Sequence, residues 1–118
     1  MRIEIQSGNI RITKRLMMFL RKRIEFALGR FQDRIQTVQV RLSDINGPKG
    51  GVDKRCQIQL KLPAQKDVVV TTKAHRLDLA IGKTAARSAR ALSRAVGKRR
   101  SRRKAERYLL KDENLIAT

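Results

Sequence analysis

The chain has 118 residues, a length suited to one domain with a single modest core. It carries 29 Lys and Arg residues against 10 Asp and Glu residues, so its formal net charge is +19. This surplus repels itself in the compact state and therefore indicates a polyanionic partner, with nucleic acid favoured over an anionic membrane surface. A single Cys excludes an internal disulfide, and the N-terminus lacks the pattern of a signal peptide. We expect a cytoplasmic protein.

The first third of the chain predicts a strand and a helix. Residues 2–6 alternate polar and apolar side chains, with Ile3 and Ile5 on the buried face. Thr13 is the expected N-cap of a helix over about Lys14–Phe31. One side of this helix is apolar and the exposed half is largely cationic, which favours docking on a sheet. Three apolar residues fall on the exposed half without explanation: Met18, Phe19 and Phe26.

Three further strands and a long helix complete the chain. Alternating patterns predict strands over about Ile35–Ile45, Lys54–Leu62 and Val68–Ala74, separated by turns at 46–51 and 63–67. The last helix is expected to begin near Arg76 and to continue past Lys98.

This order, β-α-β-β-β-α, predicts an α+β fold. We expect an antiparallel-dominated four-stranded sheet with two helices on one face. The other face is expected to be polar, with Gln39, Arg41, Gln57, Gln59 and Lys61. Residues 1–105 would form one RNA- or ribosome-binding domain. Acidic residues return after Lys104, and 106–118 read as a mobile tail whose apolar residues could instead extend the helix or bind a partner.

A row of cations on the last helix is the main candidate for a functional site. No acidic residue lies between Leu79 and Ala105. Steps of four, three, four and four residues place the row on one side of an α-helix. A merely solvated face would normally mix both signs, so this row predicts contact with nucleic-acid phosphates. Its members are Lys83, Arg87, Arg90, Arg94 and Lys98.

Two other groups of cations are candidates for the same interface. The first helix offers Lys14, Arg15 and Lys22 on its exposed half. The cluster that follows the row either extends the binding face or forms an arm that orders on binding. Its members are Arg99, Arg100, Arg102 and Arg103. Because aromatics make up only 3% of the chain, single-stranded RNA stacked on the sheet is disfavoured, and structured RNA read through its backbone is favoured.

Residues for catalysis are not grouped in the sequence. The only His, His75, has no suggested partner, and Cys56 falls on the apolar side of a strand. No catalytic pair of carboxylates, metal cluster or phosphate-binding loop is visible. We therefore predict a protein that is not an enzyme, with no cofactor, no metal, no small-molecule substrate and no membrane contact, and that is monomeric when free.

The chain resembles the ribosome hibernation promoting factors, also called ribosome-associated translation inhibitors or ribosomal subunit interface proteins. The resemblance spans about residues 1–104 and rests on the opening Met1–Thr13, on Phe31–Ile35 and on Ala80-Ile81. It implies a fold similar to a double-stranded RNA-binding domain with an added strand. It also implies binding to the small ribosomal subunit and its rRNA in the tRNA and mRNA channel, which silences ribosomes in stationary phase or stress. The family's basic positions correspond to Arg87, Arg90, Arg94 and Lys98.

The chain departs from the family pattern near the start of the last helix. Arg76, Asp78 and Gly82 stand where the family commonly has an acid, an aromatic and a further acid. Two other classes of function stay open: a structural component of a nucleoprotein, either ribosomal or DNA-binding, and a regulator that acts on another polypeptide through its C-terminal tail.

Overall fold

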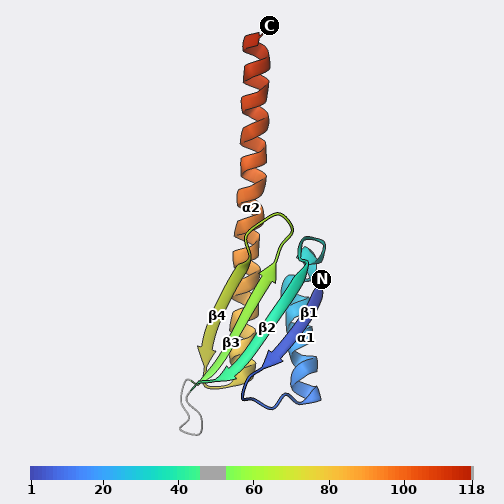
Figure 1. Cartoon of the computed structure of the whole chain (residues 1–118), viewed down its shortest axis with the longest axis vertical. Coiled ribbons are helices and arrows are strands. Elements are labelled where there is room, and N and C mark those ends of the chain that lie inside the picture. Colours follow the sequence, from blue (N-terminus) through green and yellow to red (C-terminus); the bar gives the residue numbers. More distant parts are fainter. Residues whose placement is uncertain (46–52, 118) are drawn as a thin grey trace.

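The computed structural model describes residues 1–45 and 53–117, and at 98–103 and 106–117 it describes the backbone alone. The elements in order are β1 (Arg2–Ser7), α1 (Lys14–Leu28), the 3-10 helix η1 (Gly29–Arg34), β2 (Thr37–Asp44), β3 (Lys54–Lys61), β4 (Val68–Ala74) and α2 (Leu77–Ala117). The strands form one sheet in the order β1-β2-β3-β4, with β1 parallel to β2 and the other pairs antiparallel. Both helices lie on one face of this sheet (Figure 1). The predicted α+β architecture is confirmed.

The alternating strand patterns build the core on the helix-covered face. The register sets the apolar residues of β2 directly opposite those of β3, which maximises their contact. These cross-strand pairs are Val38 with Leu60, Val40 with Ile58 and Leu42 with Cys56, all at most 1% exposed. The helices close the core from above with Leu20, Ile24 and Leu28 of α1 and with Ala80, Ile81, Ala85, Leu92 and Val96 of α2.

The opposite face of the sheet is polar, as the alternation predicts. Gln39 donates a hydrogen bond to Glu4 across the parallel pair at 3.2 Å, and Gln59 donates one to Asp67 at 2.8 Å. Arg41 and Lys61 are exposed. We call this surface the open face of the sheet.

The first helix ends earlier than the sequence suggests. Thr13 caps α1 as expected, and its hydroxyl accepts a hydrogen bond from the Leu16 N–H at 3.1 Å. The α-helix stops at Leu28, where φ is −112° and ψ is −4°, and the chain tightens into η1 instead of continuing to Phe31. The low helix propensity of Gly29 favours an end at this point. The strand ends differ from the expected ones by one or two residues, a normal scatter for element ends.

Helix α2 begins at Leu77 and passes Lys98, as predicted. The expected boundary between a folded domain and a tail, at 105/106, falls inside α2, and the side chains beyond it lie outside the described residues. The mobile tail therefore stays a prediction. The turn expected at 46–51 also lies outside the described residues.

Two buried hydroxyl groups of α2 differ in their hydrogen bonding. The Oγ1 atoms of Thr84 and Thr72 lie 2.6 Å apart, and both hydroxyls reach the carbonyl of Ala80, at 2.6 and 3.1 Å. Ser88 is one turn further along and equally buried, but its hydroxyl has no hydrogen-bond partner among the described residues. A buried hydroxyl without a hydrogen-bond partner destabilises the folded state, whereas a hydrogen-bonded one stabilises it.

Substitutions at these two positions should therefore change stability in opposite directions. Ser88→Ala should raise the free energy of unfolding by about 1 kcal/mol, because it removes an unsatisfied group and adds helix propensity. Thr84→Ala should lower it by about 1–3 kcal/mol, because it deletes a satisfied network. Urea unfolding followed by circular dichroism measures both. Destabilisation by Ser88→Ala would contradict the assignment of an unsatisfied hydroxyl.

Candidate nucleic-acid interface

The cations of α2 project away from the core because apolar burial fixes the rotation of the helix. Ile81 and Leu92 are fully buried on the sheet side, and Ser88 between them is buried too. The remaining side of the helix must then face solvent. Every described member of the predicted row is exposed there: Lys83, Arg87, Arg90 and Arg94. The side chain of Lys98 lies outside the described residues.

None of these four cations has an acidic partner among the residues whose side chains the structure describes. Ion pairs between described residues lie elsewhere, at Arg2–Glu4, Arg76–Asp78 and Lys54 with Asp44 and Asp53. The Lys54–Asp44 pair, at 2.6 Å, is the main cause that raises the pKa of Lys54. Described carboxylates do not neutralise the row on α2 in this way, which leaves its guanidinium and ammonium donors available to an external anion.

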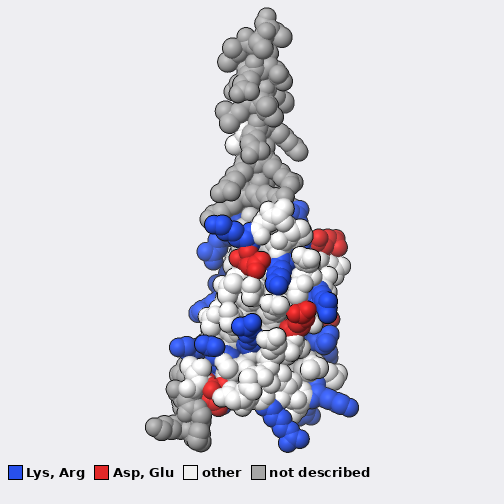
Figure 2. All heavy atoms as spheres, viewed as in Figure 1, with Lys and Arg blue, Asp and Glu red and all other residues white. Residues whose placement is uncertain are grey.

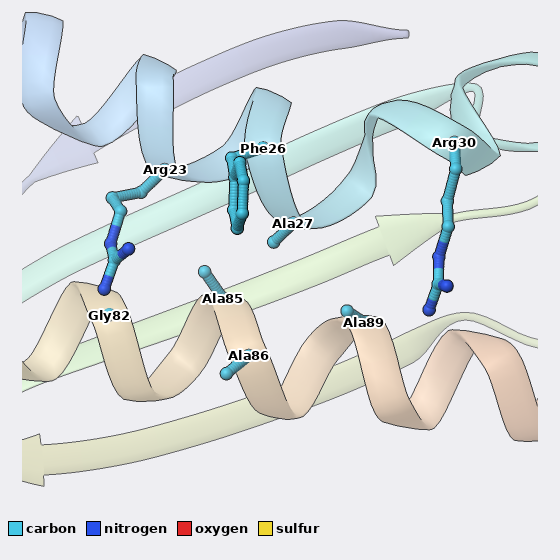
Figure 3. Close-up of a pocket in the computed structure, with 8 residues that line it drawn as sticks. All are labelled: Arg23, Phe26, Ala27, Arg30, Gly82, Ala85, Ala86 and Ala89. Carbon is cyan, nitrogen blue, oxygen red and sulfur yellow. The ribbon is translucent and has the colours of Figure 1, made fainter.

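Helix α1 and the adjoining η1 contribute both predicted and unpredicted cations. The predicted residues Lys14, Arg15 and Lys22 are exposed. Arg23 of α1 and Arg30 of η1, which are not among the site residues predicted from the sequence, line a hollow shared with α2 and point toward that helix (Figure 3). Their signal in the sequence is weak, because they border the apolar side of α1 rather than stand opposite it.

Small residues let the two helices approach closely enough for Arg23 and Arg30 to reach α2. A Cβ atom at Gly82 would stand 3.2 Å from Nη2 of Arg23, so the missing side chain gives the guanidinium its place. The hollow of about 380 Å³ is lined, besides the two arginines, by Phe26, Ala27, Gly82, Ala85, Ala86 and Ala89. We call it the interhelical groove.

The groove continues toward the cationic row. A neighbouring hollow of about 430 Å³ shares Arg23, Gly82 and Ala86 with it and adds Lys83, Asp78, Leu79, Arg87 and Arg90. Asp78 forms an ion pair with Arg76, in which Oδ2 of Asp78 lies 2.7 Å from Nη2 of Arg76. The two helices thus present one continuous surface on which described cations from both elements stand together.

The open face of the sheet is also basic, but both signs mix on it. Figure 2 views the molecule from this side and shows acidic side chains scattered among the basic ones. Oε1 of Glu4, for example, lies 3.4 Å from Nε of Arg2, and the Glu4 carboxylate also accepts a hydrogen bond from Gln39. The described side chains of the α2 row are all cationic, and a row of one sign attracts a polyanion more strongly than a mixed surface, so the helix face is the better phosphate-binding candidate.

Cys56 and His75 do not join a metal site or a cluster of reactive groups within the described residues. Burial raises the pKa of the Cys56 thiol to about 11, so it stays protonated and unreactive at neutral pH. His75 is exposed, and no three His, Cys, Asp or Glu residues gather as a metal site within the described residues. No described helix is long and apolar enough to cross a membrane.

The cluster beyond the row is placed only in part. Its backbone belongs to α2, and Lys104 is exposed. The side chains of Arg99, Arg100, Arg102 and Arg103 lie outside the described residues. Their role in binding therefore stays a prediction.

The unpaired row should carry a cost in stability. Arg90 lies three residues after Arg87 and four before Arg94, so like charges repel along the helix. Arg90→Glu should raise the free energy of unfolding by about 0.5–1.5 kcal/mol at low salt, because two repulsive pairs become attractive. The gain in the free energy of unfolding should shrink in 0.5 M salt, because charges are then screened over a Debye length on the order of 4 Å. Urea unfolding at both salt concentrations measures this, and a destabilised variant would show that Arg90 has a folded-state partner.

Comparison with known proteins confirms the resemblance seen in the sequence. The family model described as Sigma 54 modulation protein / S30EA ribosomal protein matches residues 3–100. The crystal structure of the Thermus thermophilus Protein Y N-terminal domain is 26% identical, with a TM-score of 0.66, and the match covers 80% of this chain and 98% of that chain. A ribosomal subunit interface protein from Coxiella burnetii shares the fold at 16% identity and a TM-score of 0.69, with 82% and 99% covered. No curated protein sequence matches. The chain belongs to the Sigma 54 modulation protein / S30EA ribosomal protein family.

Proposed function

We propose that this protein is a cytoplasmic ribosome-binding translation inhibitor. It would occupy the tRNA and mRNA channel of the small ribosomal subunit as a monomer and silence ribosomes in stationary phase or stress. Membership in a family described in part as ribosomal supports the ribosome as partner. The similar Coxiella burnetii structure is named for the ribosomal subunit interface, which agrees with a site between the subunits.

The single observation that carries the proposal is the exposed, unpaired row of cations on α2. Lys83, Arg87, Arg90 and Arg94 have no acidic partner among the described residues, and Arg23 of α1 and Arg30 of η1 add further charge. Guanidinium groups repeated along one side of a helix suit the regularly spaced phosphates of structured rRNA. Inhibition would be steric, because a domain held on rRNA inside the channel excludes tRNA and mRNA. No bond is made or broken, and no cofactor is required.

A charge-reversal experiment tests this site. The triple variant Arg87→Glu, Arg90→Glu, Arg94→Glu should weaken co-sedimentation with small ribosomal subunits by roughly 100-fold or more, since each lost charge-assisted contact costs about a factor of ten. Inhibition of translation in vitro should be lost in parallel. Thermal unfolding should change little, because all three side chains are exposed.

The matched control reverses three charges on the open face of the sheet. Arg41, Arg55 and Lys73 are exposed on neighbouring strands, and their replacement by Glu changes the net charge by the same amount. This control should keep most of the affinity for the subunit. Equal losses for both triple variants would mean that total charge, not the helix face, determines binding.

A structural nucleoprotein component is the second candidate, because the family description also includes a ribosomal protein. A hibernation factor should accumulate on ribosomes when growth stops, whereas a structural component should stay at constant stoichiometry. Equal affinity for plain duplex DNA would favour a DNA-binding role.

A further inference from the structure

Phe26 is exposed in a way that the fold does not require. The side chain is 87% exposed, whereas Phe19 and Phe31 are partly buried and pack against the core. A phenylalanine left in water forgoes about 1.5–3 kcal/mol of burial free energy. It stands in the middle of the cationic helix surface, where a solubility role would favour a polar residue. Single exposed apolar residues are common, and what distinguishes Phe26 is its place at the edge of a hollow that two arginines also line.

The neighbours of Phe26 form a defined setting. Arg23 precedes Phe26 by three residues on α1, Arg30 follows it in η1, and all three line the interhelical groove. Figure 3 shows the ring reaching toward Ala85 and Ala86 of α2, with one arginine on either side. The floor of the groove is built from small side chains, which leaves room beside the ring.

Each arginine lies beside an aromatic ring, and no described carboxylate neutralises it. The guanidinium of Arg30 lies 4.7 Å from the ring centre of Phe31, and that of Arg23 lies 6.0 Å from the ring centre of Phe19. Such cation–π contacts orient a guanidinium but leave its N–H donors free. Neither arginine forms an ion pair with a described carboxylate. No acidic residue lines the interhelical groove itself.

We propose that the interhelical groove binds one unpaired nucleotide of RNA, with its base stacked on Phe26 and its flanking phosphates on Arg23 and Arg30. An aromatic face offers stacking to any base, and paired arginines offer donors to phosphate. The volume of about 380 Å³ falls at the lower end of the range of about 300–1,000 Å³ for small-ligand sites. Because the floor offers alanine side chains rather than hydrogen-bonding groups, the site accepts any of the four bases.

The nucleotide site rests on the proposed function for the identity of the RNA, but its chemistry is independent of the ribosome. The cationic row of α2 holds the phosphates of a structured RNA, and the groove holds a nucleotide that leaves the stack. An acidic protein segment would also be attracted by the charge, but it would not need a flat aromatic face between two arginines.

The direct test compares two RNA probes. One is a 20-base-pair RNA duplex, and the other is the same duplex with a single-nucleotide bulge. The wild-type chain should bind the bulged duplex about 5- to 150-fold more tightly, the range expected for one base stacked on an aromatic side chain. Replacing the bulged base by each of the other three should keep the preference.

Variants of Phe26 separate stacking from simple burial. Phe26→Leu keeps an apolar side chain but removes the aromatic face, so the preference for the bulge should disappear while affinity for the perfect duplex stays. Phe26→Trp should keep or strengthen it. Met18→Ala is the matched control, because Met18 is another exposed apolar residue of α1, at 60%, and does not line the groove. Thermal unfolding checks that each variant is folded.

Several outcomes would overturn the site. They are a wild-type chain that binds both duplexes equally or neither of them, and a Phe26→Leu variant that retains the preference. A loss of small-subunit binding by Phe26→Leu with an unchanged bulge preference would likewise overturn it and indicate a protein contact. A Phe26-dependent preference together with no binding to small ribosomal subunits would support the nucleotide site and refute the proposed ribosomal function.

Discussion

Burial of one side of α2 against β3 and β4 is the constraint on which the rest of the molecule depends. Ile81 and Leu92 have no exposed surface, and rotating the helix would expose them and bury arginines instead. Burying an unpaired charge costs far more than burying a methylene group gains, so the helix has one allowed rotation. That rotation presents the cationic row to solvent. The stability of the core and the placement of the binding surface therefore have the same cause.

The close approach of the two helices is the second determinant. Gly82, Ala85, Ala86 and Ala89 lack bulk on the side of α2 that meets α1, so arginines from the other helix can lie beside the row. Larger residues would fill the groove and push those arginines outward. Charge from two elements that are distant in the sequence is thereby gathered on one surface, where it acts on the same polyanion. The cost is mutual repulsion, which the apolar core must offset.

Much of the fold follows from local patterns. The strict alternation in β3 predicts its buried and exposed faces, and the spacing of Arg87, Arg90 and Arg94 predicts their common side, because both depend only on backbone geometry. The early end of α1 at Leu28 coincides with Gly29, whose low helix propensity the periodicity of apolar residues does not register. The parallel pairing of β1 with β2, by contrast, depends on tertiary structure.

The candidate site is less predictable from the sequence, for a similar reason. Phe26 stands out there only as an apolar residue on a polar side. Arg23 and Arg30 become candidate site residues only because α2 lies beside them, and no residue spacing within α1 or η1 predicts the position of α2. The size of Gly82 matters only because an arginine from another element lies against it. Contacts between elements, rather than patterns within them, create the groove.

The salt dependence of binding tests the role of the helix face most directly. Affinity for purified small ribosomal subunits would be measured across salt concentrations for the wild type, for Arg87, Arg90 and Arg94 replaced by Gln, and for Arg41, Arg55 and Lys73 replaced by Gln. If the row on α2 contacts phosphates, the first variant should flatten the slope of log K against log salt by about 2–3, because three fewer counterions are released. The second should keep the wild-type slope. A flattened slope for the open-face variant and an unchanged one for the α2 variant would place the polyanion on the sheet and contradict the helix-face interface.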